Sequence, residues 1–332
     1  MRKYISVILI ALMLLTLCAC ENDEPQPTPE PTPEPTQTAA PTPTPPIATY
    51  NNHGKRISVY SVPEKVVTAG PNCTEVMCAL GLYSRVIGKC MTNHSLGALP
   101  ELTAAYDSIP VLSIGYPTLE DILNSGCDFL YASPWIFNDT LTVEALEQNG
   151  ILVYVNEADD FVDIWIQLRD LGRIFGVEEE SEKLYESEKE RIDAVAEVLM
   201  EVEPKSVLVV DSILDEGLVF TAGSGNIETS YIKYAGCKNV FADLKKPWDV
   251  VTADEVEMQN PDFIIIHDYS GSSFESTLEA IKEDLTLSRL DCVRNGRIIR
   301  LPLENLMPGV RSADTVEKIA YTVFYEQFAA SR

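Results

Sequence analysis

The chain has 332 residues, of which 45% are hydrophobic, and it carries 51 acidic against 25 basic side chains for a formal net charge of -26. It can bury one or two sizeable cores, so it is not disordered as a whole. The charge excludes nucleic acid and anionic membrane surfaces as primary partners, because binding a phosphate backbone takes clustered Lys and Arg.

The first segment predicts export. Two basic residues precede an apolar run over residues 4–17, too short to cross about 30 Å of hydrocarbon comfortably but suited to a signal-peptide core. The run ends in a Leu-Cys-Ala-Cys sequence that resembles the bacterial lipobox. Residues 1–19 are therefore interpreted as a lipoprotein signal and Cys20 as the lipidated residue of an extracytoplasmic protein anchored to the cell membrane. An ordinary cleaved signal and a single anchor helix are the alternatives.

Residues 20–47 are predicted to be the lipidated cysteine and a tether rich in Pro, Thr and Glu. Ten of the 21 prolines lie between Pro25 and Pro46, with almost no large apolar side chain, so the segment cannot form a core. Alternating Thr-Pro and Glu-Pro favour extended polyproline II, which at roughly 3.1 Å per residue would hold a folded body some tens of ångströms from a membrane.

Short apolar runs then alternate with helical patterns. The runs are rich in β-branched residues, which is typical of parallel strands buried on both faces. They cover residues 65–69, 128–132, 151–155, 206–210 and 262–266. Helical patterns lie between them at residues 74–80, 119–125 and 143–149, and a glycine follows each one. The alternation predicts an α/β fold.

One segment departs from the alternation, because residues 161–202 carry a nearly continuous helical pattern. Its second half is interpreted as a long helix joining two α/β lobes. The expected divisions are an N-terminal lobe at 48–177, a connecting helix at 178–203 and a C-terminal lobe at 204–332. The expected architecture is thus two Rossmann-like lobes joined by a single long α-helix, with a ligand cleft between the lobes.

Catalytic motifs are absent from the sequence. It has no Walker-type phosphate loop, no Gly-x-Ser-x-Gly elbow and no His-Glu-x-x-His pair. A three-histidine zinc site would need all of His53, His94 and His267, and His53 lies beside the tether. We expect no catalytic residue, no metal site and no resident cofactor.

Six cysteines follow the signal: Cys73, Cys78, Cys90, Cys127, Cys237 and Cys292. None has Cys-x-x-Cys spacing. They could pair outside a cell, but the favoured interpretation is that they are small, buried apolar side chains.

An exported lipoprotein with two α/β lobes and a long connecting helix resembles the substrate-binding proteins of ABC importers for ferric siderophores, haem and cobalamin. An ordered set of stretches carries the resemblance over roughly residues 57–327, although the Pro usual before the Asp of one stretch is Cys127 here. The set comprises residues 65–67, 72–76, 79–82, 86–88, 117–123, 127–130, Trp248, 251–254, 260–265, 295–298 and 308–311.

The resemblance implies an ABC permease dimer with its ATPase as partner, and one docking acid on each lobe. By position the first acid is Glu75, which also begins a helix, where the helix dipole alone favours a carboxylate. The second falls on Asp254, with Glu255 as the fallback, because the family's residue is Glu. We expect a monomer.

The ligand is expected where the strand ends of the two lobes face each other. The candidate ligand-binding residues follow strands or lie in the last loop: Tyr116, Trp135, Phe137, Trp248, Tyr269, Met307 and Arg311. Aromatic faces can cover a flat macrocycle, and cobalamin-binding relatives carry an aromatic at the position of Trp248. Arg311 is a charge-pairing residue unless it pairs with a surface carboxylate. His94, with Tyr269 or His267 opposite, is a candidate ligand of haem iron.

The expected function is capture of a metal-chelate nutrient and its delivery to a permease, with little closure on binding because a long helix resists hinge opening. The few arginines disfavour an anionic catecholate siderophore. A ferric hydroxamate and a corrinoid remain, with a haem receptor as an alternative. An exported chelatase-like or reductase-like enzyme, and a sensor or adhesin on the same fold, are the other classes.

Overall fold

The computed structural model describes residues 45–94 and 97–331, which belong to one compact unit, Thr44–Arg332. The predicted signal, Cys20 and the tether up to residue 44 lie outside the described residues. Within the described ranges, no helix is both long enough and apolar enough to cross a membrane.

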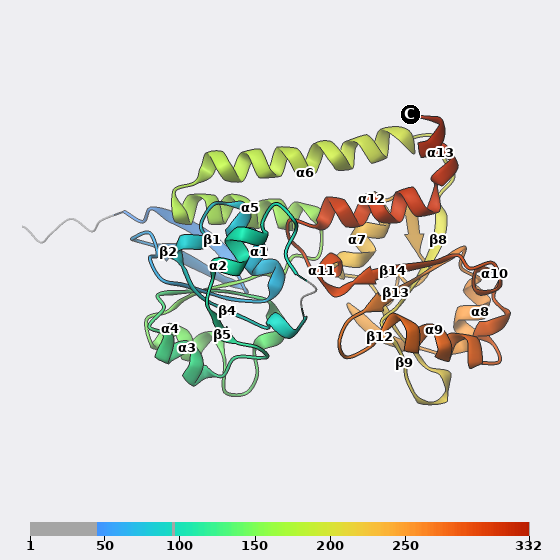
Figure 1. Ribbon diagram of the computed structural model, residues 1–332, viewed down its shortest axis with the longest axis horizontal. Coiled ribbons are helices and arrows are strands. Elements are labelled where there is room, and N and C mark those ends of the chain that lie inside the picture. Colours follow the sequence, from blue (N-terminus) through green and yellow to red (C-terminus); the bar gives the residue numbers. More distant parts are fainter. Residues whose placement is uncertain (1–44, 95–96, 332) are drawn as a thin grey trace, which may run out of the picture. The chain divides into compact units, whose positions relative to one another are not determined.

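The N-terminal lobe is built on a parallel five-stranded sheet with the order β5-β4-β3-β6-β7 (Figure 1). A hairpin of β1 (Ala48–Asn52) and β2 (Lys55–Val59) precedes this sheet. The strands of the sheet are β3 (Val66–Ala69), β4 (Val86–Cys90), β5 (Val111–Ser113), β6 (Phe129–Ala132) and β7 (Leu152–Val155), and the helices are α1 (Pro71–Ala79), α2 (Thr103–Ser108), α3 (Leu119–Ser125) and α4 (Val143–Gln148).

The central strands β3 and β6 are buried at every position, as continuous apolar runs predict for strands covered on both faces. Thr118 caps α3, and α3 ends at Gly126 with a φ of 70°, so the predicted glycine stop is confirmed there. Gly70 fixes the start of α1: its φ is 130°, and a Cβ on it would lie 2.5 Å from the Ser133 hydroxyl oxygen. This tight approach places the first turn of α1 beside the carboxyl end of β6.

The C-terminal lobe contains a parallel four-stranded sheet, β11-β8-β13-β14, and an antiparallel three-stranded sheet, β12-β10-β9. Its strands are β8 (Lys205–Val210), β9 (Ser212–Ile213), β10 (Val219–Ala222), β11 (Cys237–Asn239), β12 (Trp248–Val251), β13 (Phe263–Asp268) and β14 (Ile298–Pro302). Its helices are α7 (Ile227–Tyr234), α8 (Ala253–Gln259), α9 (Phe274–Glu283), α10 (Asp291–Arg294), α11 (Leu303–Leu306), α12 (Ser312–Val323) and α13 (Tyr325–Ala330). All five strands predicted from apolar runs are confirmed across the two lobes.

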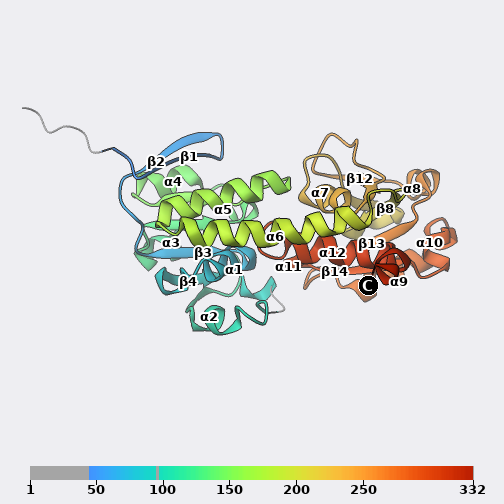
Figure 2. The same cartoon turned by 90° about the horizontal axis from the view of Figure 1, so that it is seen from above.

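Two consecutive helices, α5 (Phe161–Phe175) and α6 (Glu178–Val198), connect the lobes. Gly176 ends α5 with a φ of 68°, which breaks the continuous pattern into two helices. Figures 1 and 2 show α6 running along both lobes, packed beside α5 in the N-terminal lobe and beside α12 in the C-terminal lobe. Residues 199–203 of the expected connecting helix form a turn and a loop. The predicted fold class, two α/β lobes joined by a long helix, is confirmed.

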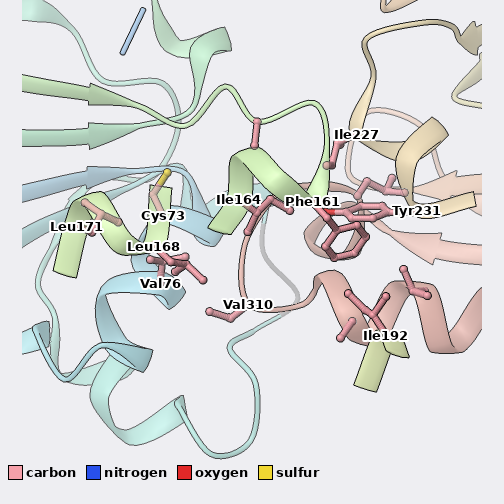
Figure 3. Packing of buried hydrophobic residues seen from close by; sticks show 14 of the residues in the cluster. Cys73, Val76, Phe161, Ile164, Leu168, Leu171, Ile192, Ile227, Tyr231 and Val310 are labelled. Atoms are coloured by element: carbon pink, nitrogen blue, oxygen red, sulfur yellow. The ribbon is translucent and has the colours of Figure 1, made fainter. Parts of the chain in front are cut away.

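Direct packing also joins the lobes. One hydrophobic cluster includes side chains from α1, α5, α6 and α7, as Figure 3 shows. Within it Phe161 of α5 contacts two tyrosines of α7 edge to face, with ring centroids 5.5 Å from Tyr231 and 4.7 Å from Tyr234. The amide nitrogens of Asn72 and Asn156 both donate to the Pro308 carbonyl, at 2.9 and 3.0 Å. The connection is therefore more than the single helix that the sequence suggests.

All six body cysteines are free and buried. Burial raises the pKa of the Cys73 thiol to about 12, although hydrogen bonds from Ser133 and Asn156 oppose the shift. The prediction that these cysteines are small buried side chains is confirmed.

Candidate ligand-binding site

A cavity of about 430 Å³ lies between residues of the two lobes. The N-terminal lobe contributes Pro71, Met91, Tyr116 and Trp135, and the C-terminal lobe contributes Asp211, Phe220, Glu228, Trp248, His267, Tyr269, Leu303, Leu306 and Met307. Most of these residues follow strands of the two parallel sheets. The carboxyl ends of parallel strands meet at one edge of a sheet, where the adjoining loops can form a cleft. The topology thus places the cavity where the sequence predicts a ligand.

Five of the predicted ligand-binding residues come together here. They are Tyr116, Trp135, Trp248, Tyr269 and Met307. The side chains of Tyr116 and Trp135 are 55% and 41% exposed, which leaves their rings open to the cleft. Their contact with a ligand stays a prediction.

Two other predicted residues lie elsewhere or are undescribed. Phe137 is half-buried against the N-terminal core, with its ring 6.4 Å from the ring of His53, and it is not part of the cavity wall. The α/β lobe uses this aromatic for packing, and its assignment to the ligand site stays a prediction that this cavity does not support. The side chain of His94 lies outside what the structure describes, and the predicted haem-ligand role stays a prediction.

Glu75 and Arg311 form a buried ion pair with each other. The two guanidinium nitrogens Nε and Nη2 of Arg311 donate to the two carboxylate oxygens of Glu75, each at 2.7 Å. Nη2 also donates to the Gly97 carbonyl at 2.7 Å, and the Leu99 amide donates to Glu75 at 2.8 Å. The side chain of Glu75 is 2% exposed, compared with 15% for Arg311.

This pairing corrects two predictions. A carboxylate on α1 that is buried and engaged in three hydrogen bonds cannot reach a partner's surface, so the docking role of Glu75 is wrong. Arg311 is not in the cavity wall, and its charge is compensated by Glu75, so its ligand role is wrong as well. The alternative prediction, that Arg311 pairs with a surface carboxylate, agrees better with the structure. The carboxylate is, however, buried and belongs to the other lobe.

A histidine held between two carboxylates forms the polar part of the cavity wall. Nδ1 of His267 lies 2.9 Å from Asp211, and Nε2 lies 2.8 Å from Glu228. The Tyr269 hydroxyl donates to the second oxygen of Asp211 at 3.2 Å. Because ionised carboxylates only accept hydrogen bonds, both ring nitrogens of His267 carry a proton.

The pKa shifts agree with an imidazolium. Burial works to lower the pKa of His267, but the charges and hydrogen bonds of Glu228 and Asp211 outweigh it and raise the pKa to about 9. Burial works to raise the pKa of Asp211, yet the hydrogen bond and charge of His267 leave it below its ordinary value. Burial, with the charge of Asp211, raises the pKa of Tyr269 to about 12. Near neutral pH the array therefore holds a protonated His267 between the carboxyl groups of Asp211 and Glu228.

Aromatic side chains form the apolar part of the wall. The ring of Trp248 stacks on Phe220 with centroids 5.3 Å apart, and it meets the His267 ring edge to face at 5.8 Å. Tyr116 and Trp135 supply further aromatic surface from the other lobe. The arrangement suits a flat ligand whose polar edge meets the Asp211–His267–Glu228 array.

The titratable side chains of the cavity wall are bonded to one another. Within the described part of the chain, no group of three or more His, Cys, Asp or Glu side chains is arranged to hold a metal ion. Both nitrogens of His267 are already hydrogen-bonded, so ligating haem iron would require breaking one of those bonds to a buried carboxylate.

The remaining predicted docking acids lie on α8, away from the cavity wall. Both Asp254 and Glu255 are exposed. Glu255 accepts hydrogen bonds from the amide and the hydroxyl of Thr252, at 2.7 and 2.9 Å, and so forms a capping box. These bonds lower the pKa of Glu255. Within the described residues, the Asp254 carboxylate has no such partner.

Sequence reasoning missed several residues of the wall. Asp211 directly follows a predicted strand, so the rule that selected the aromatics would also have selected it. Phe220 and Glu228 lie in segments without a strong sequence signal, and only the fold brings them to the cavity.

Two α/β lobes with an aromatic-walled cleft at their strand ends have the architecture of a solute-binding protein. The chain belongs to the periplasmic binding protein family, whose model matches residues 66–304.

The chain is similar to an uncharacterised ABC transporter substrate-binding lipoprotein of Bacillus subtilis, YvrC, with 21% identity over 85% of this chain and 87% of the relative. It is similar to a cobalamin-binding protein of Halobacterium salinarum, with 23% identity over 71% of this chain and 62% of the relative. Among solved structures, a periplasmic binding protein from Veillonella parvula aligns with a TM-score of 0.75 and 28% identity over 83% of this chain and 96% of that one.

Proposed function

We propose that this protein is the membrane-anchored, extracytoplasmic binding component of an ABC importer, and that it carries a ferric siderophore or a corrinoid without chemical change. The observation that carries the proposal is the aromatic-walled cavity between two lobes of a periplasmic binding protein. The relatives named as an ABC transporter lipoprotein and a cobalamin-binding protein support the same role and location.

The shape of the wall supports a chelate as cargo. Trp248 and Phe220 present a stacked pair from one lobe, while Tyr116 and Trp135 are exposed on the other. Rigid rings bury large apolar area at little cost in side-chain entropy, which favours a bulky, flat or compact complex over a flexible chain. Haem is less favoured than a corrinoid or a hydroxamate, because His267 has no free nitrogen for iron.

Tryptophan fluorescence of the purified full-length protein tests the binding role. Two of the three tryptophans, Trp135 and Trp248, line the cavity, so a bound ligand should quench a large share of the signal. We expect saturable one-to-one binding of a ferric hydroxamate or a corrinoid with a Kd at or below about 1 μM, roughly -8 kcal/mol. Calorimetry separates binding from inner-filter effects. Absence of binding to every chelate, or conversion of one into a product, would contradict the proposal.

Delivery requires a surface that the permease recognises, and α8 offers one acid for it. Thr252 and Glu255 satisfy each other in the capping box, which leaves Asp254 at the second helical position exposed. Asp254 is therefore the docking acid of the C-terminal lobe, and Glu255 fixes the helix start beneath it.

The N-terminal lobe repeats the arrangement on α3. Thr118 and Asp121 form a capping box, with the Thr118 amide donating to Asp121 at 2.8 Å and the Asp121 amide donating to the Thr118 hydroxyl at 3.1 Å. Glu120, at the second helical position, is exposed and has no partner among the described residues. The two helix starts thus match residue for residue in role, and Glu120 replaces Glu75 as the docking acid of this lobe.

Charge-neutralising variants test the docking pair. Glu120→Gln and Asp254→Asn should each reduce ligand uptake by cells that carry the cognate importer, and the double variant should abolish it, while the Kd for ligand stays within about twofold. Glu283→Gln is a matched control, because Glu283 is an exposed acid at the end of α9, and its loss changes the net charge equally. Uptake that survives the double variant would place docking elsewhere.

A further inference from the structure

Acidic side chains outnumber basic ones in the cavity wall. Its wall contains Asp211, Glu228 and His267, and no Lys or Arg is among the described residues that line it. Two acidic side chains therefore face the cavity against a single basic one. Arg311, on the contact between the lobes, does not line the cavity and is paired with Glu75.

The hydrogen bonds within the array also favour a ligand that carries donors. The imidazolium donates one N–H to Asp211 and the other to Glu228, and the Tyr269 hydroxyl donates to Asp211. What these side chains still offer a ligand is acceptor capacity, since each carboxylate oxygen can accept more than one hydrogen bond. The Asp211 side chain is 16% exposed, compared with 2% for His267, so the acceptor is the part of the array that reaches the cavity.

A ligand must complement this wall. An anionic group placed against it would lose water and meet a like charge with no donor to replace the water, which is costly in a partly buried site. An amide N–H, an ammonium or a cationic metal complex would instead find an acceptor and an attractive charge.

We propose that Asp211 and Glu228 select metal chelates that carry N–H donors and no net negative charge, and that they reject chelates with peripheral carboxylates or catecholate charge. The proposal rests on the proposed function and narrows the cargo to amide-rimmed corrinoids and neutral or cationic ferric hydroxamates. The competing interpretation is that the array only ties β8, β13 and α7 together and never meets the ligand.

A charge series on one scaffold tests the selection. The probes are a linear ferric trihydroxamate with a free terminal amine, its N-acetylated form and its N-succinylated form, which differ by one charge at each step around an unchanged metal centre. A corrinoid with intact propionamides and its monocarboxylate form a second pair. Affinity should fall by about tenfold for each added negative charge.

Variants assign the selection to the named carboxylates. In Asp211→Asn, measured at about pH 6 so that His267 stays protonated, the ratio of the cationic to the anionic Kd should change by about tenfold towards the anionic chelate. Glu228→Gln provides a second variant if the first does not fold, and circular dichroism reports folding of both. Glu283→Gln removes an equal charge from the exposed end of α9, and it should leave the ratio unchanged.

The outcomes separate the two proposals. Binding that follows the charge order and loses it in the variants supports the selection. Chelates that bind equally well whatever their charge, or a charge order that survives both variants, would overturn the selection while leaving the receptor role intact. No binding by any chelate would overturn the proposed function and this inference together.

Discussion

The Glu75–Arg311 pair makes the sharpest quantitative prediction about the fold. Replacing Arg311 with Ala removes two donors to Glu75 and leaves a carboxylate that is 2% exposed, with the Leu99 amide as its remaining donor among the described residues. Breaking a buried ion pair from one side typically costs about 3–5 kcal/mol, because the remaining charge stays buried without compensation. For a body of this size that corresponds to a fall in Tm of roughly 5–15 °C.

The double variant Glu75→Met, Arg311→Met distinguishes charge from packing. Replacing both members of a buried pair by apolar side chains of similar volume is often neutral, so most of the lost stability should return. Stability is measured by urea denaturation followed by circular dichroism, and ligand affinity by tryptophan fluorescence in parallel. The matched control is Arg300→Ala, because Arg300 is 49% exposed and its pairs with Asp268 and Glu275 should be worth about 1 kcal/mol or less.

Ligand affinity decides what Arg311 does. We expect Arg311→Ala to retain binding within a fewfold wherever it remains folded, because the guanidinium faces Glu75 and not the cavity. A variant with unchanged stability and lost affinity would refute the inter-lobe assignment and restore the role predicted from the sequence.

Three further predictions concern pH, shape and the thiols. Burial raises the pKa of Glu188 to about 7, above its ordinary value, so the native state binds this proton more tightly and stability should fall by up to about 3 kcal/mol as pH rises from roughly 4.5 to 7. Glu188→Gln should flatten that slope in pH-dependent denaturation; an unchanged slope would assign it to other groups. Small-angle scattering should show a change in radius of gyration well under about 1 Å on ligand binding, and a larger compaction would contradict the joined lobes. A thiol reagent should leave the six body cysteines unmodified in the native protein and label them after unfolding, because they are buried; rapid native labelling would contradict their burial.

The fold was predictable because its signals are local. A parallel strand covered on both faces must be apolar at almost every position, and the run from Phe263 shows this without reference to any other segment. The aromatic residues of the cavity could also be predicted, because ligands bind at the carboxyl ends of parallel strands whatever the order of the strands in the sheet. That reasoning, together with the family resemblance, predicted Trp248 and Tyr269 as ligand-site residues, and both line the cavity.

The errors arose where partners are distant in sequence. Glu75 and Arg311 are separated by 236 positions, and each one alone looks like a charge available to a partner or a ligand. The Asp211–His267–Glu228 array draws on three separate segments in the same way. The fold buries such charged side chains against each other. The local sequence around each residue does not predict that it will be buried.

The contacts between the lobes bear on how a ligand is chosen and released. Asn72, Asn156 and the Phe161–Tyr231 contact join the lobes beside the cavity, so we expect binding to involve little closing motion. Discrimination must then come from groups that are already in place, which are the aromatic wall and the carboxylates of the array. On the proposed function, we expect release to require the permease to draw the lobes apart. The proposed docking acids Glu120 and Asp254 lie on opposite lobes, as that separation by a two-subunit permease would require.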